Sequence, residues 1–262
     1  MNYKTFFKKA KEKGLTNIQV TEKQTIDSSV EIINSKMESF DDYNNIDYHI
    51  KAEYNGKTVK TSCNYLDTNI LNLLILKAKK TDSYYEDEYL SNRKSIPKNK
   101  PLNFDISKEI MLLKGLDELK KEYDQVQKLT TYFSETYTNT RIINSNGVDI
   151  STDSHLCSFV VEAIAENNGE FTSYDRKVLE TDKSKIDFIS VTKDVLEKVM
   201  IQSNKIKLTT KKYTVLLDSY VAGKIISNIT NMLSATSIRN KVSCLEKSLN
   251  KKVFSEKLTI IE

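Results

Sequence analysis

Residues 48–63 of the 262-residue chain read YHIKAEYNGKTVKTSC, and this stretch indicates the fold class most clearly. Apolar and polar side chains alternate on both sides of the dipeptide Asn55-Gly56, as they do in strands with one buried face. Asn-Gly favours a two-residue hairpin turn because both turn positions require a positive φ. The stretch therefore predicts an antiparallel β-hairpin.

Patterns with helical spacing lie on both sides of this hairpin. Residues 3–13 predict a short helix, and Gly14 after them is a typical helix end. Residues 69–80 predict an amphipathic helix that packs on a sheet. The apolar positions behind these predictions are Phe6, Phe7 and Ala10 in the first helix, and Leu71, Leu74, Ile75 and Ala78 in the second.

The other predicted strands and helices come in blocks. Strands are expected at residues 17–21, 29–34, 36–43, 129–137, 141–144, 148–165, 170–178 and 213–217. Helices are expected from Ser107 to Val126, around 191–199 and over 222–233, and turns at Ser145-Asn146-Gly147 and Asn167-Asn168-Gly169. Strands and helices in separate blocks indicate an α+β fold of mostly antiparallel sheets with flanking helices.

A change of composition divides the chain. Residues 81–101 are first acidic and rich in tyrosine and then basic, and they contain both prolines of the chain. Such stretches mark linkers between domains. We therefore expect an N-terminal α+β domain over residues 1–95, a helix and antiparallel meander over residues 96–210, and a strand–helix segment over residues 211–262.

The charge pattern argues against a nucleic-acid-binding protein. The chain has 40 Lys and Arg residues against 36 Asp and Glu, and arginine occurs only at positions 93, 141, 176 and 239. Arginine guanidinium groups are the side chains best suited to recognise bases and phosphates. No run of like-charged residues makes up for the small number of arginines. We therefore do not expect nucleic acid as a partner.

The apolar segments are short, and the cysteines are few. No window approaches the roughly 18 apolar residues of a membrane helix, and the N-terminus lacks the apolar core of a signal peptide. We therefore expect a cytoplasmic protein without a membrane partner. Cys63, Cys157 and Cys244 are odd in number and far apart, which favours reduced, buried thiols over disulfides.

The common catalytic motifs are absent from the sequence. Its two histidines, His49 and His155, fall in different predicted domains: His49 on the polar face of the hairpin, and His155 on the apolar face of a strand. No His-Glu-x-x-His, Cys-x-x-Cys, Gly-x-Ser-x-Gly or glycine-rich phosphate loop occurs, and we expect no histidine near a cysteine. The residues alone thus predict no catalytic centre.

The C-terminal third resembles a known family. Residues 213–226 (YTVLLDSYVAGKII), 243–255 (SCLEKSLNKKVFS) and 258–262 (LTIIE) are similar in order and spacing to the TldD/PmbA family of proposed DNA gyrase modulators and metallopeptidases. Residues 141–148 (RIINSNGV) resemble the family's Asn-Ser-x-Gly turn. The chain thus looks like the two-part N-terminal region of such a protein.

In the catalytic TldD branch, a helix carries His-Glu-x-x-x-His, and the resemblance places these catalytic positions on Ser227, Asn228 and Met232. The chain therefore looks closer to the PmbA/TldE branch, which lacks the motif. Asn228 and Asn231 are candidate groove-lining residues, the alternative being ordinary exposed helix residues. The resemblance also implies that the chain holds no cofactor, because zinc would bind only in a motif-bearing partner subunit.

The family's members continue into a β-rich C-terminal domain, so we expect a shortened chain that stops before it. The function implied by the resemblance is that of a non-catalytic subunit of a bacterial, cytoplasmic peptidase that processes or degrades peptides. Its partner would be a TldD-like paralogue or a second copy of the chain. The alternatives are a stand-alone binding module, acting on gyrase or nucleic acid, and a divergent enzyme whose ligands lie beyond residue 262.

Overall fold

The computed structural model describes residues 1–80, 94–95, 104–248 and 250–258. By its internal contacts the chain divides into an N-terminal unit, Met1–Ile206, and a C-terminal unit, Lys207–Glu262. The predicted boundary near residue 95 lies beside residues 96–103, which are outside the described ranges. None of the helices in the described ranges is long and apolar enough to cross a membrane.

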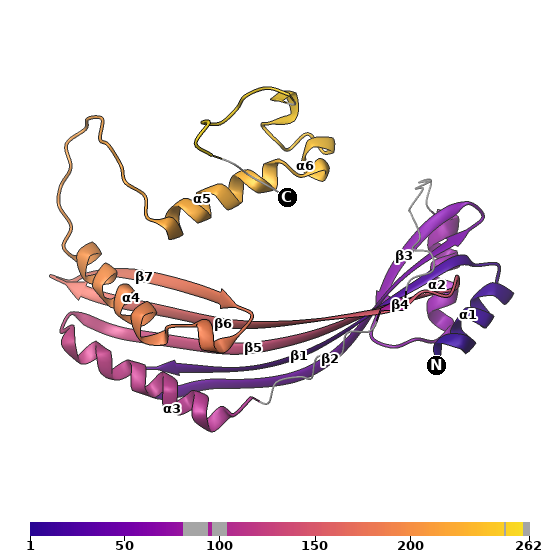
Figure 1. The fold of residues 1–262 in the computed structure, drawn as a ribbon, viewed down its shortest axis with the longest axis horizontal. Coiled ribbons are helices and arrows are strands. Elements are labelled where there is room, and N and C mark those ends of the chain that lie inside the picture. Colours follow the sequence, from indigo (N-terminus) through magenta and orange to yellow (C-terminus); the bar gives the residue numbers. More distant parts are fainter. Residues whose placement is uncertain (81–93, 96–103, 249, 259–262) are drawn as a thin grey trace. The chain divides into compact units, whose positions relative to one another are not determined.

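The N-terminal unit is built on a seven-stranded sheet in the order β3-β2-β1-β5-β6-β4, with β7 also paired to β6 (Figure 1). All pairings are antiparallel except that of β4 with β6. This confirms the predicted α+β class. The strands are β1 (Thr16–Ile33), β2 (Lys36–Tyr54), β3 (Lys57–Cys63), β4 (Lys94–Ser95), β5 (Val126–Asn144), β6 (Asp149–Asn167) and β7 (Glu170–Glu180).

The predicted hairpin is confirmed as β2 and β3. Tyr48 pairs with Cys63 and Tyr54 with Lys57, while Asn55 and Gly56 have φ values of 50° and 73°. The same left-handed backbone occurs at Asn168 and Gly169, in the turn between β6 and β7. The turn sequences therefore set the strand connections at both positions, because these residues tolerate a positive φ.

Several predicted strands are parts of longer ones. The separate ranges 17–21 and 29–34 belong to one strand, β1, of 18 residues, and the ranges 129–137 and 141–144 belong to β5, of 19 residues. The alternation of apolar and polar residues fades between the predicted ranges, so the sequence pattern indicates two short strands in place of each long one. β1 pairs with both β2 and β5, so backbone hydrogen bonds continue through these polar positions whatever side chains they carry.

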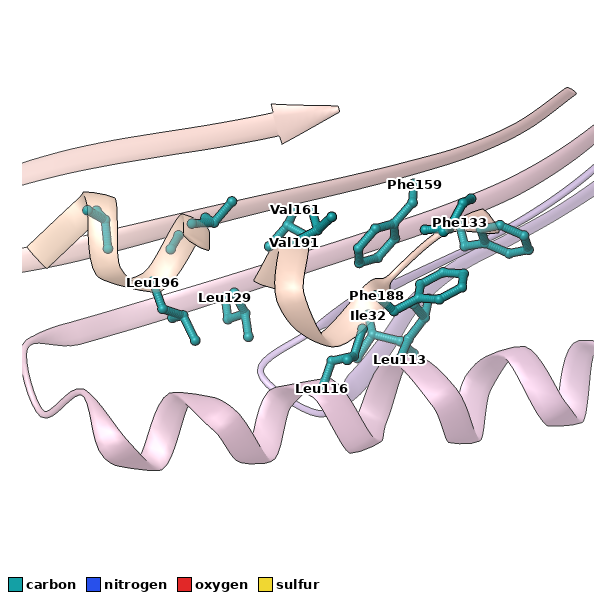
Figure 2. Close-up of a cluster of buried hydrophobic side chains, with 14 of the residues drawn as sticks. Ile32, Leu113, Leu116, Leu129, Phe133, Phe159, Val161, Phe188, Val191 and Leu196 are labelled. Atoms are coloured by element: carbon teal, nitrogen blue, oxygen red, sulfur yellow. The ribbon is translucent and has the colours of Figure 1, made fainter. Parts of the chain in front are cut away.

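Two hydrophobic cores lie along this sheet. One lies under α1 (Tyr3–Glu12) and α2 (Thr68–Lys80), which confirms both predicted helices. The other lies between the sheet and two helices, α3 (Ile106–Asp117) and α4 (Phe188–Ser203), as Figure 2 shows. Its largest fully buried side chains include Phe133, Phe159, Ile32, Leu113, Leu129 and Leu196.

The helix predicted from Ser107 to Val126 is too long. α3 ends at Asp117 and is followed by a 3₁₀ helix, η1 (Glu118–Glu122), and Val126 is the first residue of β5. Leu119 and Tyr123 nevertheless pack against the same core as Leu116. The apolar spacing is therefore real, but it reflects a shared core and not a continuous helix.

The C-terminal unit contains α5 (Ser219–Met232), α6 (Ala235–Arg239) and η3 (Glu246–Ser248). The predicted helix at 222–233 is thus confirmed, and the Asp218 side chain caps it by accepting from the Val221 amide at 2.8 Å. The strand predicted at 213–217 is wrong for the described structure, since these residues are not paired with another strand. A strand needs such a partner for its backbone groups. Residues 259–262, which belong to the stretch 258–262 that resembles the family, lie outside the described ranges.

Candidate functional site

The residues at the positions of the zinc motif lie on α5 and are exposed. Ser227 and Asn231 are one helical turn apart, as are Asn228 and Met232, so the four share one side of the helix. The Asn228 amide donates to the Lys224 carbonyl at 3.1 Å. The groove-lining role of Asn228 and Asn231 stays a prediction.

The donor atoms on this helix do not fit a zinc site. Zinc in proteins is bound by thiolate, imidazole or carboxylate, whereas Ser227, Asn228 and Met232 offer a hydroxyl, an amide and a thioether. The Met232 sulfur instead accepts from the Cys244 thiol at 3.5 Å. Within the described ranges, no three His, Cys, Asp or Glu side chains are grouped so that they could hold a metal ion.

A second group of polar side chains surrounds His155 of β6, at the edge of the core under α3 and α4. The Nδ1 atom of His155 lies 2.9 Å from the Thr181 carbonyl oxygen and therefore carries the proton of that hydrogen bond. Its Nε2 atom faces Glu135 Oε2 at 3.7 Å and Cys157 Sγ at 3.9 Å. His155 and Cys157 face the core side of β6, as their shared strand parity predicts.

Burial sets the chemistry of the cysteine in this group. It raises the pKa of the Cys157 thiol to about 11, and the charges of Glu135 and Asp182 act in the same direction. The thiol is therefore neutral near pH 7. Nucleophilic cysteines react as thiolates, so Cys157 is not in the reactive form at this pH. The expectation that no histidine lies near a cysteine is wrong, because residues two apart on a strand point to the same face. This spacing was visible in the sequence.

An ion pair joins α3 to the segment before α4 beside this group. Glu109 of α3 is only 4% exposed, and its Oε1 atom accepts from the ammonium of Lys183 in η2 (Lys183–Lys185). The other oxygen, Oε2, is buried and has no hydrogen-bond partner among the described residues. The Lys183 ammonium also lies 5.2 Å from the centre of the Phe133 ring. This pair could not be predicted from the sequence, because no local pattern relates residues this far apart.

Glu135 makes the stability of the N-terminal unit depend on pH. Burial raises the pKa of its carboxyl from the ordinary value of 4.5, and Glu109 raises it further, while His155 and Lys183 lower it. Between the pKa of Glu135 in the unfolded chain and its higher pKa in the folded chain, the folded chain binds more protons. The free energy of unfolding therefore falls as pH rises through this window. We expect Glu135→Gln to remove this part of the decline.

The measurement is urea unfolding of wild type and Glu135→Gln at several pH values from about 4 to 8. Glu170→Gln is the matched control, because the Glu170 side chain is 70% exposed. We expect the control to keep the wild-type pH dependence. A Glu135→Gln variant with that same dependence would contradict a buried, titrating carboxyl at this position.

Comparison with known families places these features in a class of proteins related to metallopeptidases. Residues 99–202 match the model of the PmbA/TldA metallopeptidase central domain, and residues 210–262 match that of the PmbA/TldA metallopeptidase C-terminal domain. The two matches together cover more than half of the chain. The chain belongs to the PmbA/TldD family. Residues 210–262, expected to lead into the family's C-terminal domain, match the model of that domain itself.

Solved structures with the same fold include two proteins described as proposed modulators of DNA gyrase. The protein from Thermotoga maritima has a TM-score of 0.74 and 16% identity over 93% of this chain and 57% of its own. The Bacteroides thetaiotaomicron protein has a TM-score of 0.76 and 16% identity over 96% of this chain and 61% of its own. TldE from Thermococcus kodakarensis has a TM-score of 0.57 and 10% identity over 75% of this chain and 47% of its own. No curated protein matches the chain significantly.

Proposed function

We propose that this protein is the non-catalytic subunit of a cytoplasmic TldD/TldE-type metallopeptidase that processes or degrades peptides. The observation that carries this proposal is the donor set on α5. A member of a metallopeptidase family has neutral Ser227, Asn228 and Met232 where the catalytic branch has His, Glu and His. Such side chains neither bind a zinc ion nor act as a general base. In this proposal the partner subunit provides both the zinc site and the general base.

The apolar side of α5 supports assembly with another subunit. Val221, Ile225 and Met232 are 37%, 46% and 37% exposed, and no residue of α5, which the structure describes in full, is buried. Apolar surface that stays exposed on one helix is a common mark of an interaction site. The partner is a motif-bearing paralogue or a second copy of this chain.

The test is cleavage of casein or an unstructured peptide by this protein, by a family member that carries His-Glu-x-x-x-His, and by their mixture. We expect this protein alone to be inactive and to bind no zinc, and the mixture to form a complex whose activity a chelator abolishes. Chelator-sensitive cleavage by this protein alone would contradict its non-catalytic role. Failure of the two proteins to form a complex would remove the subunit hypothesis.

Ser227→His/Asn228→Glu/Met232→His is the matched variant for this assay. We expect it to stay inactive alone, because two histidines supply only two of the three protein ligands that catalytic zinc sites use. Activity of this triple variant alone would mean that the remaining ligands already exist in the chain.

A stand-alone binding module is the second candidate. The description of two structural neighbours as proposed gyrase modulators favours it. It requires binding to gyrase, or to duplex DNA at about 150 mM salt, where weak non-specific contacts are mostly lost. Such binding without any complex with a motif-bearing paralogue would favour this candidate over the peptidase subunit.

A further inference from the structure

A pocket of about 620 Å³ lies between α1, the start of β1 and the turn that joins β5 to β6. Sites that bind small molecules have volumes of this size, apolar walls and a few polar groups. We call this site the turn pocket, because residues 144–147 form one of its sides. The other residues that matter here are Phe7, Lys8, Lys11, Asn17 and Ile18.

A bulge in β1 joins the two sides of the turn pocket. The pairing of β1 with β2 is interrupted between Thr16 and Gln19, and Asn17 in this bulge has a φ of 46°. Ile18 bonds to the β5–β6 turn in both directions. Its amide donates to Ser145 Oγ at 3.2 Å, and its carbonyl accepts from the Ser145 amide at 2.8 Å. The turn is therefore held beside the end of α1.

The turn itself is fixed by the side chain of Asn144, which is only 4% exposed. Its Oδ1 atom accepts from the amide of Asn146 at 2.9 Å and from the amide of Val148 at 3.0 Å. Gly147 lies between them with a φ of 87°, a conformation that glycine adopts without steric cost. The pocket is thus formed before a ligand binds, so little conformational entropy is lost on binding.

Two lysines of α1 bring positive charge to the turn pocket. Lys8 and Lys11 are three positions apart, so they share one side of the helix. Both are exposed, and neither forms an ion pair with a described acidic residue, Glu12 on the next turn included. None of the described residues that line the pocket is acidic. The charges of both lysines are therefore available to a bound anion.

Apolar and amide groups lie beside these charges. Ile18 is 1% exposed, and Phe7 is partly buried against the core under α1 and α2. The Asn17 amide nitrogen donates to Glu53 at 2.7 Å. Within the described ranges, Asn17 Oδ1 and Asn146 Nδ2 have no hydrogen-bond partner. The pocket thus offers apolar surface, one amide acceptor, one amide donor and positive charge.

We propose that the turn pocket binds the C-terminal residue of a peptide when that residue is apolar. The free carboxylate lies at Lys8 and Lys11, since hydrogen bonds between charged groups are the strong ones. The apolar side chain packs against Phe7 and Ile18 and is removed from water. The preceding peptide group bonds to the two asparagine amides.

A fatty acid is the other common anion with an apolar part, but the amides favour a peptide. A hydrocarbon chain would remove water from Asn17 Oδ1 and Asn146 Nδ2 without replacing their hydrogen bonds, which costs free energy. A peptide group has both an N–H and a carbonyl for them. The site is independent of the proposed peptidase role, because its test needs neither zinc nor a partner subunit.

The experiment is calorimetric titration of the protein at low salt with an N-acetylated oligoalanine peptide that ends in leucine with a free carboxylate. We expect a dissociation constant below about 1 mM. The amidated form of this peptide and a form that ends in glycine should each bind about tenfold more weakly, because the first lacks the charge and the second lacks the apolar side chain. Absence of binding, or equal affinity for the free and amidated forms, would overturn the proposal.

Lysine variants locate the bound carboxylate. Lys8→Gln and Lys11→Gln should each weaken binding about fivefold, because each removes a charge-assisted contact. Lys4→Gln is the matched control, since Lys4 is an exposed lysine of the same helix that does not line the pocket. It should leave binding unchanged. Equal weakening by the three variants would overturn the proposal.

Two further measurements keep the test independent of variant folding. The leucine peptide should protect Lys8 and Lys11 of the wild-type protein from acetylation, as measured by mass spectrometry, and should leave Lys4 unprotected. Octanoate should bind more weakly than the leucine peptide. Equal protection of Lys4, or tighter binding of octanoate, would overturn the assignment to a peptide C-terminus.

Discussion

Phe133→Ala is expected to lower the free energy of unfolding of the N-terminal unit by about 4 kcal/mol, a large part of the stability of a typical domain. Phe133 is fully buried in β5 and lies between two other rings. It stacks on Phe104 at 6.2 Å between ring centres and meets the edge of Phe188 at 5.5 Å. Truncation removes this buried surface and leaves a cavity between the sheet and α4.

The measurement is urea unfolding followed by circular dichroism. Phe171→Ala is the matched control, because Phe171 is in the same sheet, on β7, but is 64% exposed. We expect this control to cost less than about 0.5 kcal/mol. Similar losses for the two variants would contradict the position of Phe133 at the centre of the core.

Lys183→Met is expected to lower the free energy of unfolding by about 3 kcal/mol, because it leaves the Glu109 carboxylate buried without its counter-charge. Glu109 has one oxygen paired with Lys183, and the other has no hydrogen-bond partner in the described part of the chain. The Lys183 side chain is 33% exposed, so water partly solvates the ion pair. The expected loss of unfolding free energy therefore lies near the lower end of the range for breaking a buried ion pair.

A double variant separates the ion pair from simple packing. Glu109→Met/Lys183→Met should be more stable than Lys183→Met, because an apolar pair of similar size leaves no buried charge. Lys185→Met, at an exposed position two residues away, should change stability by less than about 0.5 kcal/mol. A double variant as unstable as Lys183→Met would mean that the charge of Glu109 is not the cause.

Local chemistry explains which elements were predictable. The Asn55-Gly56 hairpin, α1 and α2 follow from turn residues and apolar periodicity within one short stretch each.

The two mistakes in element length have one physical cause. β1 and β5 continue through polar positions because neighbouring strands satisfy the hydrogen bonds of their backbone groups. The predicted helix ends before Val126 because Val126 is the first residue of strand β5. Neither effect is encoded in nearest-neighbour spacing.

The family resemblance and the absence of zinc ligands at Ser227, Asn228 and Met232 can be read from the order of residues alone, since both depend on residue type and spacing. The ion pair of Glu109 with Lys183 and the turn pocket cannot be read this way. The first joins residues 74 positions apart through packing of α3 against the segment before α4, and the second depends on the contact of Ile18 with Ser145, 127 positions away. Contacts of this kind form only when whole elements dock, because their geometry depends on register and on the shared core.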